Sequence, residues 1–255
     1  MNVWRGYVLA GFLVLIAAGA HADDPPNFPV NVPTHELFQP EAIFRPGMTP
    51  DQVKTLFAGR KPHWKMRESE EFLLRRGWEQ SLPNERFIQA IIAREERDDV
   101  DHSYLLRFTS PLGHSQLYKV TQSLKRKTGQ SGFMKLTDWS DFMLKRFGAP
   151  QRMTTLESNI SLIYYLGTDH RPLSDGKDRC RRAGSMYSGL ELKTDSELAQ
   201  VLSYIDETGC REILIVSADS GKDGLAESLV VSIVDMKRQA EDTRARWWRK
   251  PPPGR

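Results

Sequence analysis

The sequence predicts an α+β protein in which short helices pack on antiparallel meander sheets. A capped amphipathic helix is predicted near residue 50, and closely spaced segments rich in aromatic and β-branched residues follow it. The same order recurs after residue 131. Connections this short favour antiparallel neighbours. Two alternatives remain: two tandem repeats of a helix and a sheet, or one domain whose elements recur by chance.

The first predicted helix lies in the stretch FRPGMTPDQVKTLFAG, residues 44–59. Thr49 is a favourable N-cap, the proline after it suits the first helical position, and Gln52 completes a capping box. The segment Val53–Phe57 places apolar residues at i, i+3 and i+4, on one face. Gly59 suits the C-cap. The helix therefore needs a second surface to cover its apolar stripe.

Three segments after this helix predict strands. They are rich in aromatic and β-branched residues, and short polar turns separate them. The segments are residues 86–96, 102–110 and 115–127. The first half is thus predicted to be a helix followed by a three-stranded meander.

The second half predicts the same order. A helix is expected over residues 136–150, with Asp138 as its N-cap and Gly148 at its end. A polar insertion is expected at 169–189. Strands are predicted at 158–167, 197–206, 211–219 and 227–238, and a helical turn is the alternative for residues 197–206.

The N-terminus predicts export. Arg5 precedes an unbroken apolar run from Val8 to Ala20, and Ala20-His21-Ala22 fits the site of a signal peptidase. The apolar run is shorter than the roughly 20 residues of a membrane-spanning helix, although a membrane anchor is the alternative. We therefore expect a periplasmic or secreted protein.

These observations divide the chain into five predicted parts. They are a signal peptide at 1–22, a Pro-rich extended leader at 23–40, a first helix-and-sheet unit at 41–130, a second unit at 131–238, and a basic Trp-containing tail at 239–255. Cleavage after residue 22 removes one arginine and lowers the formal net charge from +3 to +2. A charge this small, spread along the chain, does not indicate a nucleic-acid partner.

Cys180 and Cys210 are the only cysteines. In an oxidising compartment an isolated pair favours a disulfide. Such a bond would close a loop of about 30 residues and stabilise the fold by about 3–4 kcal/mol. Two separate thiols, one of them reactive, are the alternative.

The opening stretch resembles a known family. It carries the Gly-Met-Thr-x-x-Gln-Val signature of the SmpA/OmlA small lipoproteins of outer-membrane assembly, followed by a glycine and a proline. The matching residues are Gly47, Met48, Thr49, Gln52, Val53, Gly59 and Pro62. Phe142, Gly148 and Pro150 resemble the same element more faintly. The resemblance implies a helix on an antiparallel sheet, as in β-lactamase-inhibitor protein, and a non-catalytic module that binds other proteins.

No catalytic, cofactor or metal site is predicted. The five histidines after residue 22 lack the i, i+4 spacing of a helical zinc site, and neither a Gly-x-Ser-x-Gly elbow nor a Walker loop is present. His102 and His114 flank neighbouring predicted strands and either meet across the sheet or lie exposed in turns. Residues 219–224 resemble part of a calcium loop, but a hairpin turn is the preferred interpretation.

The C-terminal segment RARWWRKPPPGR is strongly basic and contains no acidic residue. Arginine beside tryptophan suits an anionic membrane surface or a partner groove. The candidate contacts are Arg244, Arg246, Trp247, Trp248, Arg249 and Lys250. A disordered terminus is the alternative.

The predicted function is an exported, non-catalytic protein-binding module of the bacterial cell envelope, acting without a cofactor. Its partner would be an envelope protein or peptide that docks on an open sheet face. The candidate docking aromatics are Tyr104, Phe108, Tyr118, Tyr164 and Tyr165. The alternatives are an exported hydrolase with a scattered site and a membrane-surface protein anchored by its tail.

Overall fold

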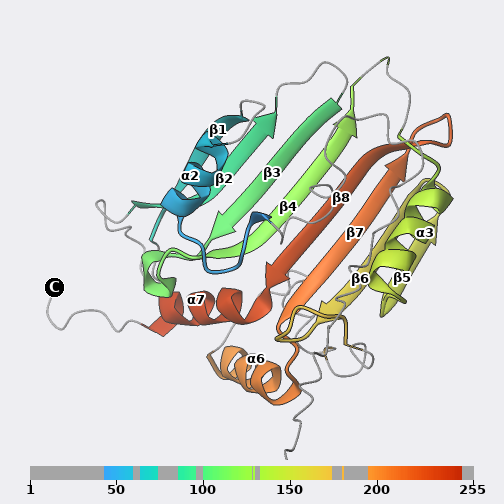
Figure 1. Cartoon of the computed structure of the whole chain (residues 1–255). Coiled ribbons are helices and arrows are strands. Elements are labelled where there is room, and N and C mark those ends of the chain that lie inside the picture. The colour runs from blue at the N-terminus through green and yellow to red at the C-terminus, as the bar shows by residue number, and fades with distance from the viewer. Residues whose placement is uncertain are drawn as a thin grey trace, which may run out of the picture.

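The computed structural model describes residues 43–59, 64–73, 86–95, 100–127, 129, 133–173, 180 and 195–248. In this part of the chain, eight strands form one antiparallel sheet in the order β1-β2-β3-β4-β8-β7-β6-β5 (Figure 1). The strands are β1 (Trp64–Phe72), β2 (Arg86–Glu95), β3 (Val100–Phe108), β4 (Leu117–Arg126), β5 (Arg152–Leu156), β6 (Asn159–Leu166), β7 (Glu212–Ser220) and β8 (Ala226–Asp235). The helices are α2 (Pro50–Ala58), α3 (Leu136–Phe147), α6 (Asp195–Thr208), α7 (Met236–Trp248) and the 3-10 turn η1 (Pro111–Gly113). The predicted α+β class is confirmed.

The two halves of the sheet have matching topology. In each half a helix precedes four strands, α2 before β1–β4 and α3 before β5–β8, and α6 lies between β6 and β7. The last strands of the halves, β4 and β8, pair at the centre. The meanders therefore join into one continuous sheet, whereas the sequence suggested a separate sheet in each half.

Helix α2 has the predicted capping box. The Thr49 backbone N–H donates to Gln52 Oε1 at 2.9 Å, and the Gln52 backbone N–H donates to Thr49 Oγ1 at 3.4 Å. Val53 and Phe57 are buried. Phe57 and the preceding Phe44 pack with Tyr104 of β3 in an aromatic cluster. The apolar stripe of α2 thus covers the β1–β4 half of the sheet.

Helix α3 begins at Leu136, as the predicted range does, but its N-cap is Lys135 rather than Asp138. Lys135 forms an isolated bridge with Leu225, so the extended backbone ends at that residue and the helix starts immediately after it. Trp139 and Met143 are buried against β6, β7 and β8. Cross-strand neighbours place this apolar cluster on the same face of the sheet as the α2 cluster.

Two strand predictions in the second half are corrected by the structure. Residues 197–206 form part of α6, in which Leu198, Val201 and Ile205 are buried at helical spacing, so the helical alternative is the correct one. The last strand ends at Asp235 instead of Arg238. Asp235 Oδ1 accepts a hydrogen bond from the Arg238 backbone N–H at 2.9 Å, which is N-cap geometry for α7.

Strands β1 and β5 were not predicted. They form the two edges of the sheet, and most of their residues are exposed. An edge strand with charged or polar residues on both faces lacks the apolar alternation that identifies a strand from sequence.

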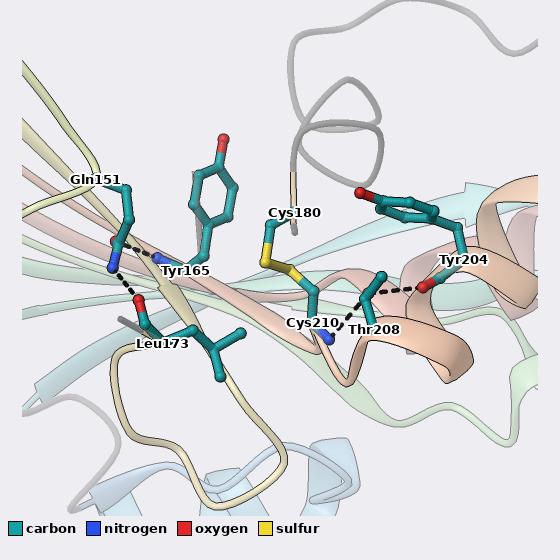
Figure 2. The surroundings of a disulfide bond; sticks show 7 residues. All are labelled: Gln151, Tyr165, Leu173, Cys180, Tyr204, Thr208 and Cys210. Carbon is teal, nitrogen blue, oxygen red and sulfur yellow. Dashed lines mark hydrogen bonds between the residues drawn. A yellow bond between two sulfur atoms is a disulfide. The ribbon is translucent and has the colours of Figure 1, made fainter. Parts of the chain in front are cut away.

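The predicted disulfide joins Cys180 to Cys210 (Figure 2). Both cysteines are fully buried in an apolar cluster with Val201 and Ile205 of α6. Thr208 supports the same corner, since its hydroxyl donates to the Tyr204 carbonyl and accepts from the Cys210 backbone N–H. The bond therefore lies under α6, on the face of the sheet opposite α2 and α3.

Candidate functional site

A basic groove crosses the face of β1–β4 that points away from α2. Its volume is about 880 Å³. Basic side chains dominate its lining: Lys65, Arg67, Arg94, Lys125 and Lys127. Arg67, Arg94 and Lys125 are exposed, and none of the three forms an ion pair within the described part of the chain. Asp101 also lines the groove and lies 3.9 Å from Lys127.

Two cross-strand pairs on this face bring like charges together. Lys65 lies directly opposite Arg94, and Arg107 lies directly opposite Lys119. Like charges at directly opposed positions destabilise a sheet. Burial lowers the pKa of Lys119, and the positive charge of Arg107 lowers it further. This face of β1–β4 therefore carries a positive potential that an anionic ligand would relieve.

A buried polar network lies below the groove, on the α2 side of the sheet. His102 Nδ1 is 2.7 Å from Glu95 Oε2, and Gln122 Nε2 lies 3.0 Å from His102 Nε2 and donates to the Tyr104 hydroxyl at 2.9 Å. His102 is buried and pairs with Leu124, whereas the exposed His114 follows η1 at the far end of β3. The two histidines therefore do not meet across the sheet, and His102 was wrongly expected in an exposed turn. The network connects β2, β3 and β4 on the side of the sheet away from the groove.

A second hollow, the seam cavity, lies at the centre of the sheet, on the face that α2 and α3 cover. Its volume is about 510 Å³. Strands from both halves line it, through Leu117 and Val120 on one side and Leu214 and Ile233 on the other. Phe44, which precedes α2, and Phe147, the last residue of α3, contribute further apolar walls. The seam cavity is therefore a product of the join between β4 and β8.

Two titratable residues that line the seam cavity, His170 and Glu212, contact each other. His170 Nδ1 lies 2.7 Å from Glu212 Oε2. The Glu212 side chain is 2% exposed, and within the described residues its other oxygen, Oε1, has no hydrogen-bond partner. Burial raises the pKa of Glu212, while the hydrogen bond from His170 acts in the opposite direction. His170 has a φ of 62°, in the left-handed region, which costs a non-glycine residue about 1 kcal/mol.

The residues of the family signature have structural contacts rather than a common pocket. Gly47 has a φ of 95°, and its N–H donates to the Leu117 carbonyl at 2.9 Å. The Met48 carbonyl accepts from the Leu117 N–H at 2.8 Å. A Cβ on Gly47 would lie 3.3 Å from the Arg238 guanidinium. The signature thus ties the start of α2 to β4 and α7, and its Pro62 lies outside the described residues.

The predicted tail contacts divide into three groups. Arg246 is held within the fold, 2.9 Å from Asp242, 3.7 Å from Glu71 and over the ring of Phe87. Arg244 is an exposed residue of α7. The backbones of Trp247 and Trp248 continue α7, and their side chains lie outside the described part, as do Arg249 and Lys250.

The predicted docking aromatics do not form an exposed surface. Tyr104, Phe108 and Tyr164 are at most 1% exposed, beneath the helices. Tyr118 and Tyr165 pack against the cluster around the disulfide, on the α6 side. Alternation along a strand separates two faces but does not reveal which face a helix covers, so the sequence could not divide these rings between core and surface.

Residues 219–224 comprise the end of β7 and the hairpin turn that leads to β8, in which Asp223 pairs with Arg126 at 2.7 Å. Across the described residues, no group of three or more His, Cys, Asp or Glu side chains is arranged to hold a metal ion. In the same part of the chain, no helix is both long and apolar enough to span a bilayer.

Comparisons with known proteins add no relative. No family model, no curated protein and no solved structure matches the chain.

Proposed function

We propose that this chain is an exported, non-catalytic protein-binding module of the bacterial cell envelope, and that its basic groove binds an acidic segment of a partner protein. The single observation that supports this most is that Lys65 and Arg94, which both line the groove, lie directly opposite each other on β1 and β2. Like charges in opposed positions cost folding free energy, and a bound acidic segment offsets that cost. The apolar N-terminal run and the buried disulfide favour an exported location, where a protein partner is more accessible than nucleic acid.

The two halves support a tandem origin for the module. Each consists of a helix and a four-stranded meander, and the halves meet through their last strands. This order agrees with the resemblance of residues 47–62 to the SmpA/OmlA family and to the arrangement in β-lactamase-inhibitor protein. We infer a duplicated unit whose first copy kept basic residues on the open face. At equivalent positions in the central strands of the second copy, such as Ser217, Val230 and Ser232, the face carries small or neutral side chains.

Site-specific photo-cross-linking in the native host tests the proposal. A photoreactive amino acid replaces Ser123, which lines the groove, and in a second strain replaces Lys145 on the outer surface of α3. We expect a discrete adduct with one envelope protein from position 123 alone. Reversing two groove charges, with Arg67→Glu and Arg94→Glu together, should abolish that adduct, whereas Lys145→Glu should preserve it. Equal adducts from both positions, or an adduct that survives the double reversal, would contradict the proposal.

The hydrolase alternative retains one supporting observation, the contact between His170 and Glu212 at the seam cavity. A carboxylate that orients a histidine is a common arrangement for a general base. The described residues that line the cavity include neither serine nor cysteine, so the nucleophile would be an attacking water or the hydroxyl of Thr168. Turnover of ester or peptide substrates that is lost in His170→Gln would support this second function, and activity that persists in this variant would exclude the site.

A further inference from the structure

The seam cavity combines an apolar interior with one incompletely satisfied buried acid. Glu212 lies directly across the sheet from Leu166 on one side and Asp235 on the other. Cross-strand neighbours point to the same face, so the Glu212 side chain lies on the face that α2 and α3 cover, where it lines the cavity. Buried polar atoms are almost always hydrogen-bonded, and the unpartnered Oε1 within the described structure therefore indicates a missing donor.

The other charged groups that line the cavity are ion-paired or exposed. Arg211 Nη2 pairs with Asp235 at 3.3 Å, while the buried Arg211 Nε has no hydrogen-bond partner in the described structure. Arg45 is exposed to solvent, and the His170 side chain, which is 57% exposed, already contacts Glu212. Water weakens the attraction that exposed charges exert on a ligand, whereas a buried carboxylate acts at a lower effective dielectric constant. Glu212 is therefore the buried acid that a cationic head group would meet in the cavity.

We propose that the seam cavity binds a small amphiphile with a primary amine or other cationic hydrogen-bond donor, its head group on Glu212 Oε1 and its apolar body among Val120, Leu214 and Ile233. The volume of about 510 Å³ falls within the roughly 300–1,000 Å³ that small-molecule pockets occupy. A protonated amine supplies the donor that Oε1 lacks and neutralises the carboxylate as it leaves water. This inference is independent of the proposed partner, because the seam cavity and the basic groove lie on opposite faces of the sheet.

Calorimetric titration of the purified protein with three ligands of equal chain length tests the head group directly. The probes are n-octylamine, sodium octanoate and 1-octanol, each below its aggregation concentration. We expect n-octylamine to bind at least tenfold more tightly than the other two. Octanoate binding more tightly than octylamine would assign the site to an anion, and equal or absent binding of all three would show that Glu212 selects no head group. Each of these results would overturn the proposal.

Variants distinguish binding in the seam cavity from nonspecific adsorption of the probes to the protein surface. Glu212→Gln should weaken octylamine binding roughly 10- to 100-fold, because a charge-assisted hydrogen bond is lost, and should leave octanol binding unchanged. Thr168→Trp, at the exposed rim, should block all the alkyl probes. Glu157→Gln, in the exposed turn between β5 and β6, is the matched control and should bind as the wild type does. Because the selectivity of the wild type is measured separately, the test holds even where a variant fails to fold. Octylamine binding that is unchanged in both Glu212→Gln and Thr168→Trp would place the ligand elsewhere and refute the assignment.

Discussion

Removal of the disulfide is expected to cost a large part of the stability of this protein. Cys180 and Cys210 are 30 residues apart in sequence. On the chain-entropy model, opening a loop of this length stabilises the unfolded chain by about 3.6 kcal/mol at 25 °C. Domains are typically stable by only about 5–15 kcal/mol, so the reduced protein would lie close to the limit of stability.

Urea denaturation followed by circular dichroism measures the effect, with Cys180→Ala/Cys210→Ala as the variant. For a denaturant slope of about 2–3 kcal/mol/M, the midpoint should fall by roughly 1–2 M. Wild-type protein in a thiol reductant is the control for lost packing, since it keeps both buried sulfur atoms. A midpoint shift below about 0.3 M in both samples would refute the reasoning, because it would mean that the loop is already constrained in the unfolded state.

Three further predictions concern η1, the seam cavity and the C-terminus. Gly113→Ala should lower the free energy of unfolding by about 1–3 kcal/mol, because its Cβ would lie 2.7 Å from Thr109 Cβ and 2.9 Å from Asp242 Oδ1 of α7. Gly59→Ala is the control: its Cβ would meet nothing closer than 3.9 Å, and it should be nearly neutral in the same urea assay. Burial raises the pKa of Glu212 above 4.5, so between pH 4.5 and the raised pKa the folded state binds more protons than the unfolded state and stability falls as pH rises. Glu212→Gln should lack this fall, and identical pH–stability curves for variant and wild type would contradict it. If the tail binds membranes, deletion of 249–255, which spares the Arg246 contacts, should abolish flotation with anionic vesicles, and unchanged flotation would exclude that role.

Helix α2 shows why some of the fold was predictable. Its capping box joins Thr49 and Gln52, three residues apart, and its buried residues Val53 and Phe57 share one face at i, i+4. Interactions of this range involve only neighbours along the chain, so the local sequence is sufficient to predict this helix and its buried face. At α6 the sequence left a strand and a helical turn open for residues 197–206, and packing against β6 and β7 decides for the helix.

The candidate sites depend on contacts between distant segments. His170 and Glu212 are 42 positions apart, and the opposition of Lys65 to Arg94 exists only because β1 and β2 pair in one register. A shift of that register by one residue would move these side chains to the other face. No local pattern reports such a register when the strand is an exposed edge, and β1 was therefore missed together with the groove.

The sequence by itself determined the α+β class, the capped first helix and the pairing of its two cysteines, because each depends on short-range pattern or on composition. The tertiary structure decided that the two meanders join through β4 and β8, which creates the seam cavity, and that the aromatic residues lie beneath helices while the basic residues remain on the open face. The physical reason is that burial is a property of the whole assembly: a strand presents two faces, and only the packing of other elements determines which of them meets water.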